Sequence, residues 1–155
     1  MDFRFLRVLL AALFTLSSTT AYAESDLERF EKLSEAMSAK MNILLVKEMP
    51  QVADYLPSTE WDDDYRKAGA CMLKKYESLL GEGFLEDMIS KGEAFLAREF
   101  SGFEDMTTAA ADFAPKGLTD QDQVRINQEC GMMQLHQKRM MESGFAEAMM
   151  RAAGG

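Results

Sequence analysis

Histidine and cysteine are scarce in this chain, whose 155 residues include one histidine and two cysteines. A zinc motif of the H-E-x-x-H type needs two histidines and is excluded. No G-x-S-x-G segment, which presents the nucleophile in many hydrolases, occurs either. Acidic side chains are plentiful enough for carboxylate chemistry, but no pattern singles out a pair. The sequence therefore predicts a protein that is not an enzyme and carries no cofactor.

Basic residues are outnumbered, since 17 lysines and arginines face 26 aspartates and glutamates, for a formal net charge of −9. Nucleic-acid phosphates select basic surfaces, so the balance excludes nucleic acid as a partner. The same charge opposes electrostatic docking on anionic lipid. A protein partner, basic in charge, is the macromolecule that this composition favours, because opposite charges speed the encounter.

Long apolar runs are rare, and the clearest one lies near the N-terminus. Arg4 and Arg7 precede nine apolar or threonine residues at 8–16, and Ala21-Tyr22-Ala23 provides an A-x-A cleavage site. Nine residues are too few to span a bilayer, which needs about 20. The pattern predicts a cleavable secretory signal peptide over residues 1–23.

Removal of the leader would leave residues 24–155, which we expect to form a single all-α domain in the periplasm or outside the cell. No N-x-S/T sequon is present, which favours a bacterial periplasm over a eukaryotic secretory route. No further stretch approaches membrane-spanning length, so we expect no membrane span in the mature chain.

The two cysteines, Cys71 and Cys130, both lie in the predicted mature chain, 59 positions apart. An even pair of cysteines in an oxidising compartment is typical of a structural disulfide. Two free or metal-binding thiols are the alternative. Neither cysteine belongs to a C-x-x-C motif, so a thiol oxidoreductase is not expected.

Apolar residues recur every three or four positions, which is typical of helices. The segment Ser25-Asp26-Leu27-Glu28 predicts a capping box at the start of the first helix, and Pro50 ends that helix. Its predicted apolar face is Leu27, Phe30, Leu33, Met37, Met41 and Leu44.

Further helices are predicted along the rest of the chain, and Gly92 on the third would let a neighbouring helix approach closely. We expect an all-α bundle of about four main helices, with the disulfide joining the second helix to the last. The expected helices run from Ser58 or Thr59 to before Gly81, from Phe84 to Phe100, from Asp105 to Phe113 and from Thr119 to Glu142, with a terminal turn or two over Phe145–Arg151.

Methionines gather near the C-terminus, where Met133, His136 and Met140 are spaced to share one helix face. Thioethers and an imidazole are suitable ligands for Cu(I), which makes copper the alternative cofactor. Methionine is also a flexible core filler and a common residue of adaptable binding surfaces. The sequence leaves core, partner surface and metal site open here.

Phe145, Met149 and Met150 fall on one face of the last predicted helix. Such a face suits a groove on a partner or self-association. We therefore expect a non-enzymatic exported binding or adaptor protein, with Cu(I) binding as the alternative.

The acidic run Glu60, Asp62, Asp63 and Asp64 lacks the alternating ligands and central glycine of a calcium-binding EF-hand loop. Carboxylates at a helix start complement the helix dipole, which accounts for the run more simply.

The segment Tyr76-Glu77-Ser78-Leu79-Leu80-Gly81 resembles the F-Y-x-S-P-x-G segment of a domain-of-unknown-function family of small secreted bacterial helical proteins. Lys75 and Leu79 stand where that family has Phe and Pro. The resemblance implies an exported α-helical domain without established catalytic residues. Gly81 is also a natural helix C-cap without reference to any family.

Overall fold

The computed structural model describes residues 25–113 and 117–153, and the predicted signal peptide lies outside these residues. The described chain is all-helical, as the sequence predicts. It contains more helices than the expected four, because the last predicted long helix is divided in two, and short helices form in the connector after the first helix, before Pro115 and at the C-terminal end. The elements are α1 (Asp26–Glu48), the 3₁₀ helix η1 (Pro50–Tyr55), α2 (Asp63–Leu80), α3 (Phe84–Ala97), α4 (Phe103–Phe113), α5 (Asp120–Glu129), α6 (Met132–Glu142) and α7 (Phe145–Ala153).

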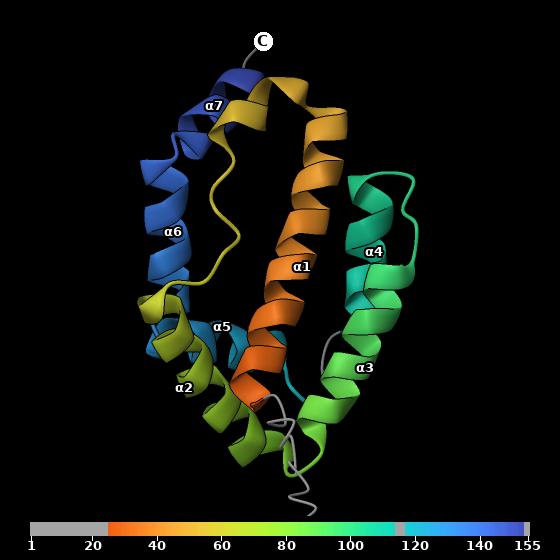
Figure 1. Cartoon of the computed structure of the whole chain (residues 1–155), viewed down its shortest axis with the longest axis vertical. Coiled ribbons are helices and arrows are strands. Elements are labelled where there is room, and N and C mark those ends of the chain that lie inside the picture. The colour runs from red at the N-terminus through yellow and green to blue at the C-terminus, as the bar shows by residue number, and fades with distance from the viewer. Residues whose placement is uncertain (1–24, 114–116, 154–155) are drawn as a thin grey trace, which may run out of the picture.

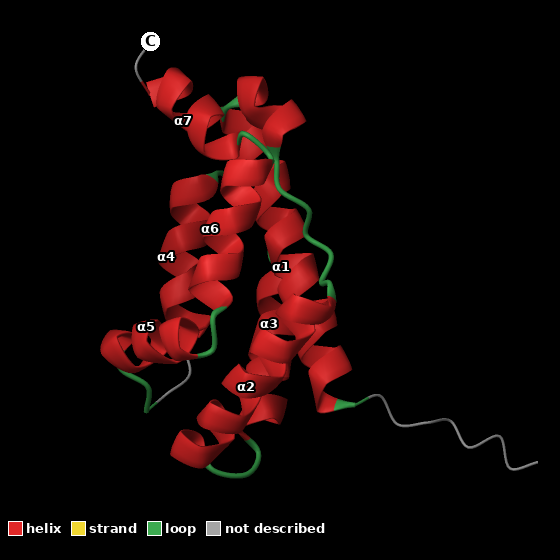
Figure 2. Cartoon of the chain, turned by 90° about the vertical axis from the view of Figure 1, so that its left-hand side faces the viewer, coloured by secondary structure: helices red, strands yellow, loops and turns green. Residues whose placement is uncertain are grey.

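Helix α1 runs through the middle of the molecule (Figure 1). Helices α3 and α4 lie on one side of it, and α2 and α6 lie on the other. α7 and η1 lie together at one end of the molecule (Figure 1), the end at which Figure 2 labels α7. The segment between η1 and α2, residues 56–62, descends between the ribbons of α1 and α6 in Figure 1.

The start of α1 confirms the predicted capping box. The Ser25 hydroxyl accepts a hydrogen bond from the Glu28 backbone N–H at 3.2 Å, and the Glu28 carboxylate accepts one from the Ser25 backbone N–H at 2.7 Å. The helix ends at Glu48, and Pro50 follows as the first residue of η1. Both ends of α1 therefore follow from local chemistry that the sequence displays.

The predicted start of the second helix at Ser58 or Thr59 is wrong, since α2 begins at Asp63. The Asp62 carboxylate accepts hydrogen bonds from the backbone N–H groups of Asp64 and Tyr65, at 3.1 and 2.9 Å. The Ser58 hydroxyl instead accepts from Glu60, two residues on, which is a local turn. Asp62 is the stronger cap, and residues 56–62 stay outside the helix.

The predicted long helix from Thr119 to Glu142 is also wrong in one respect, because it breaks into α5 and α6. Gly131 adopts a φ of +77°, a left-handed conformation that interrupts the helical path. The Thr119 cap is confirmed, since its hydroxyl accepts from Asp122 N–H at 3.1 Å. The third helix ends at Ala97, three residues before the predicted Phe100.

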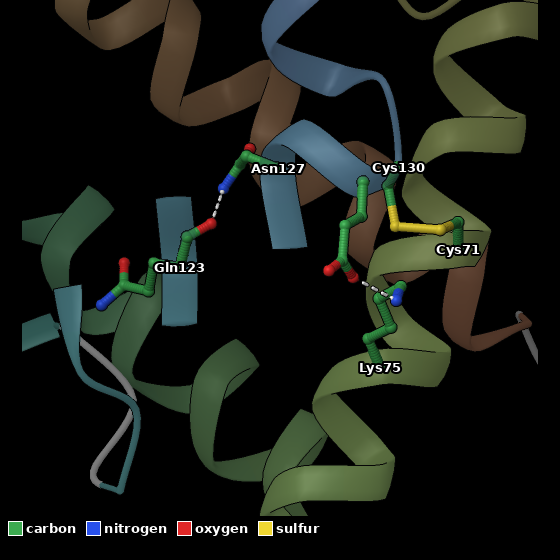
Figure 3. The surroundings of a disulfide bond; sticks show 6 residues. Cys71, Lys75, Gln123, Asn127 and Cys130 are labelled. Carbon is green, nitrogen blue, oxygen red and sulfur yellow. Dashed lines mark hydrogen bonds and ion pairs between the residues drawn. A yellow bond between two sulfur atoms is a disulfide. The ribbon is translucent and has the colours of Figure 1, made fainter. Parts of the chain in front are cut away.

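The Cys71–Cys130 disulfide is present, with 5.6 Å between the two Cα atoms. It joins α2 to the turn after α5, just before α6 begins (Figure 3). Beside it, the Lys75 ammonium and the Glu129 carboxylate form an ion pair at 2.5 Å. The crosslink therefore holds the N-terminal end of α6 against α2.

Buried apolar side chains form three clusters in the described chain. The largest lies between α1, α2, α3, α5 and α6, a second between α1, α3 and α4, and a third between α1, η1 and α7. Within the described residues, no helix is both long enough and apolar enough to cross a bilayer.

Gly92 on α3 lies against Leu33 of α1, as the sequence predicts. A Cβ atom there would stand 2.5 Å from Leu33 Cδ1, far inside van der Waals contact. We expect Gly92→Ala to lower the free energy of unfolding by about 1–2 kcal/mol in urea, because overpacking outweighs the better helix propensity of alanine. Ser90→Ala, at an exposed position of α3, is the control. A Gly92→Ala variant more stable than the wild type would contradict close contact between the helices.

Candidate functional site

A cavity of about 260 Å³ opens between α1 and α6, beside residues 56–62. Its volume exceeds the roughly 150 Å³ that holds a benzene molecule in an engineered protein core. Its apolar walls come from α1, the segment 56–62, α6 and the start of α7: Met41, Leu45, Pro57, Trp61, Met140 and Phe145. Polar groups, including Tyr65, His136 and Arg139, complete the lining.

Trp61 is the only tryptophan in the chain, and it forms part of the cavity wall. Its indole packs edge-on against Phe30 with 5.6 Å between the ring centroids. It also covers Gly69 of α2, where a Cβ atom would stand 2.2 Å from the indole Cζ3. The Trp61 backbone N–H donates to the Glu35 carboxylate at 2.6 Å. These contacts fix the indole between α1 and α2.

Tyr65 and His136 meet across the gap between α2 and α6. The Tyr65 hydroxyl and His136 Nδ1 share a hydrogen bond of 2.9 Å, with the ring centroids 5.4 Å apart. Within the described chain, the structure shows no hydrogen bond to His136 Nε2. Tyr65 therefore orients the ring through one of its two nitrogens.

Arg139 holds residues 58–62 in place from α6. Its Nη1 donates to the carbonyl oxygens of Ser58 and Glu60 at 3.1 and 2.6 Å, and its Nη2 donates to the Asp62 carboxylate at 2.9 Å. The guanidinium carbon also lies 3.6 Å from the centroid of the Tyr65 ring. Only 16% of the Arg139 side chain is exposed, so its charge lies largely within the protein.

Neighbouring groups shift the pKa values of Asp62, Tyr65 and His136. Hydrogen bonding from the Tyr65 backbone N–H, followed by Arg139, lowers the pKa of Asp62. Burial raises the pKa of the Tyr65 hydroxyl. Desolvation by neighbouring groups, followed by the positive charge of Arg139, lowers the pKa of His136, although the residue as a whole is exposed. At neutral pH the site therefore holds a neutral phenol, a neutral imidazole and an arginine paired with Asp62.

The lowered pKa of His136 predicts a pH-dependent stability. The unfolded chain binds a proton near the ordinary value of 6.5, and the folded chain binds it only at lower pH. Because the unfolded state then holds more protons, stability is full above pH 6.5 and falls as pH drops toward the folded pKa. We expect urea midpoints of the wild type to decrease between pH 7.5 and 5.5.

His136→Gln should remove this decrease, because glutamine does not titrate. Carboxylates titrate near pH 4 and contribute little in this window. If His136→Gln loses stability over the same window as steeply as the wild type, the assignment to His136 is wrong.

The three residues of the predicted copper face all lie on α6, and two of them line the cavity. His136 and Met140 line the cavity and Met133 does not, although Met133 and Met140 are similarly exposed, at 40% and 38%. Met41 of α1 lines the cavity opposite them. Among the described residues, no group of three or more His, Cys, Asp or Glu side chains is arranged to hold a metal ion.

The predicted partner face on α7 is partly occupied. Phe145 and Met149 are half-buried and pack against the cluster formed by Leu45, Val52 and Ala148. Met150 is 68% exposed. α7 therefore covers part of the core, and Met150 is the member of the predicted face that remains on the surface.

The acidic run takes the structural role expected from its position. Asp62 caps α2, and Asp63 and Asp64 occupy its first turn. Sequence patterns did not indicate the cavity, because Trp61 and Tyr65 fit the apolar stripe of a helix and Arg139 belongs to no motif. Spacing within one helix could not show that Met41 faces α6.

Gly81 is the C-cap of α2 with a φ of +81°, as predicted, while the family resemblance around it remains a prediction. No family model matches the chain, and neither a curated protein nor a solved structure matches it.

Proposed function

We propose that this chain is a non-enzymatic binding protein whose ligand occupies the cavity between α1 and α6. The observation that supports the proposal is an apolar cavity with convergent polar side chains along one wall. Small-molecule sites are commonly concave and apolar, with a few polar groups that fix the orientation of the ligand. Here those groups are Tyr65, His136 and Arg139, which hydrogen bonds and ring contacts already hold in position.

A binding role fits the chemistry of this wall better than catalysis does. A histidine acting as general base requires a nucleophile or substrate proton within reach and an orienting partner. The orienting partner of His136 is a phenol with a raised pKa, which does not supply the negative charge of a carboxylate. We also propose an exported, periplasmic location, which the leader pattern and the oxidised cysteine pair support.

The proposal is tested with N-phenylnaphthylamine, a neutral probe that becomes fluorescent in apolar sites. We expect saturable binding with energy transfer from Trp61, because the lone tryptophan forms part of the cavity wall. Ser38→Phe should block binding, since Ser38 lines the cavity and phenylalanine would fill it. Ser90→Phe, at an exposed position of α3, is the matched control. Equal binding by both variants, or no binding by the wild type, would contradict the proposal.

Cu(I) binding is a second candidate function, favoured by one observation. Met41, His136 and Met140 line the same cavity from two helices, and Tyr65 orients the ring through Nδ1. Thioether and imidazole ligands suit Cu(I), and a hydrogen bond to the second ring nitrogen is usual for a ligating histidine. Met41 replaces the exposed Met133 in this ligand set.

The copper proposal is tested by anaerobic Cu(I) titration against bicinchoninate as competitor. Met41→Leu with Met140→Leu should weaken Cu(I) binding, because leucine keeps the volume and removes the sulfur. Met133→Leu with Met150→Leu is the control, since both residues are exposed outside the cavity lining. Wild-type affinity in the Met41/Met140 variant would exclude the site.

A further inference from the structure

We propose that the cavity selects organic molecules that combine an apolar body with a carboxylate group. This inference rests on the proposed function and names the class of ligand. It depends on Arg139, the one charged residue among the described residues that line the cavity. No aspartate or glutamate belongs to the described lining, and Asp62, which pairs with Arg139 at 2.9 Å, lies outside it.

Arg139 has capacity left for an anion. The guanidinium offers five N–H donors, and the bonds to Ser58, Glu60 and Asp62 are made by its two Nη atoms. Nε takes part in none of these bonds. His136 Nε2, on the same helix one turn away, provides a second polar group for the same carboxylate.

Acidic residues around the cavity repel an anionic ligand, whereas Arg139 attracts it. The strength of each interaction depends on how far solvent screens the charge. Asp63 is 91% exposed, so solvent and salt screen its charge, with a Debye length of about 8 Å at physiological ionic strength. Asp62 is 61% exposed but lies 2.9 Å from Arg139 Nη2, well inside that length, so it offsets part of the charge of the arginine. Arg139 is 16% exposed and is screened much less. A ligand inside the cavity therefore experiences an arginine whose charge Asp62 offsets in part.

The apolar body of the ligand fits the rest of the lining. Leu45, Trp61, Met140 and Phe145 supply aliphatic, aromatic and thioether surface. Methionine adapts to irregular apolar shapes, so Met41 and Met140 allow some variation in the ligand. A carboxylate at the Arg139 wall would place the apolar chain along these side chains.

The test compares octanoate, octanol and octylamine, which share one chain and differ in the head group. Binding is measured by Trp61 emission and by calorimetry on the mature chain at pH 7.5. We expect octanoate to bind about tenfold more tightly than octanol, since hydrogen bonds to charged groups are the stronger ones. Octylamine should bind more weakly than octanol.

Two variants at neighbouring positions test the contribution of the Arg139 charge without removing the arginine. Asp62→Asn removes the competing carboxylate, and asparagine is an equally good helix cap, so α2 should stay intact. We expect octanoate affinity to rise about threefold, with octanol unchanged. Asp63→Asn changes the net charge equally but leaves the Arg139 ion pair in place, and it should have a smaller effect.

The outcomes separate this inference from the proposed function. Equal affinities for octanoate and octanol, or equal effects of Asp62→Asn and Asp63→Asn, would overturn the carboxylate preference and leave the binding cavity standing. Failure of all three molecules and of N-phenylnaphthylamine to bind would overturn both.

Discussion

Replacing Cys71 and Cys130 by serine is expected to lower the free energy of unfolding by about 4 kcal/mol. The disulfide closes a loop of 59 residues, and the chain-entropy model relates that length to the ordering of the unfolded chain. A domain of this size is stable by about 5–15 kcal/mol in total, so the loss is a large share. Urea unfolding of oxidised wild type and double variant measures the difference.

Loss of the disulfide should also affect the cavity, because the crosslink holds the start of α6 on α2, and α6 carries His136 and Arg139. We expect the double variant to bind N-phenylnaphthylamine more weakly than the oxidised wild type. Wild type reduced with dithiothreitol should match the double variant in urea. Coinciding unfolding curves of oxidised wild type and double variant would show that the disulfide contributes nothing to stability.

Trp61→Ala is expected to cost about 3–5 kcal/mol, the range found when a large buried aromatic side chain is removed. The indole packs on Phe30 and covers Gly69, and it is 9% exposed. Its loss would leave a void between α1 and α2 and remove a wall of the cavity. Circular dichroism must report unfolding, because the variant has no tryptophan fluorescence.

Two further variants separate the packing role of the Trp61 indole from its role in the cavity wall. Trp61→Phe should cost clearly less than Trp61→Ala, because phenylalanine refills part of the space. Gly69→Ala keeps Trp61 but places a Cβ atom against it, so the indole must move. We expect Gly69→Ala to weaken probe binding and to shift Trp61 emission. A Trp61→Ala cost below about 1 kcal/mol, as for surface substitutions, would contradict this packing.

Much of the fold could be predicted from the sequence, because it depends on local interactions. Ser25 and Glu28 form a reciprocal cap within one turn, and Gly92 stands on an apolar face where close packing is the simplest use of glycine. Pro50 removes a backbone donor and ends α1 whatever surrounds it. Each of these effects acts over a few residues, so a pattern in the sequence was enough to predict it.

The wrong start of α2 and the missed break between α5 and α6 come from competing local signals in the sequence. Ser58, Thr59 and Asp62 are all acceptable caps, and only the contact of Arg139 with residues 58–62 shows which segment stays extended. Helical spacing continues through Gly131, so periodicity alone joined α5 to α6. The glycine was the available signal for the break, and its left-handed φ is what separates the two helices.

The cavity could not be predicted, because its walls come from three parts of the chain that lie far apart in sequence. Met41, Trp61 and His136 converge only through the packing of α1, the 56–62 segment and α6. The copper hypothesis named two residues that line the cavity, His136 and Met140. Its third residue, Met133, shares their helix but does not line the cavity, because spacing along one helix does not show what lies across from it.

The most direct test of the binding cavity uses two residues that occur once in the chain. His136 and Trp61 each give a single, unambiguous set of ring signals in the proton NMR spectrum of the mature protein. During an octanoate titration, we expect the imidazole and indole signals to shift along one saturation curve, with nuclear Overhauser contacts between the ligand chain and the indole. Saturable binding that leaves both rings unmoved would place the ligand elsewhere and contradict the account.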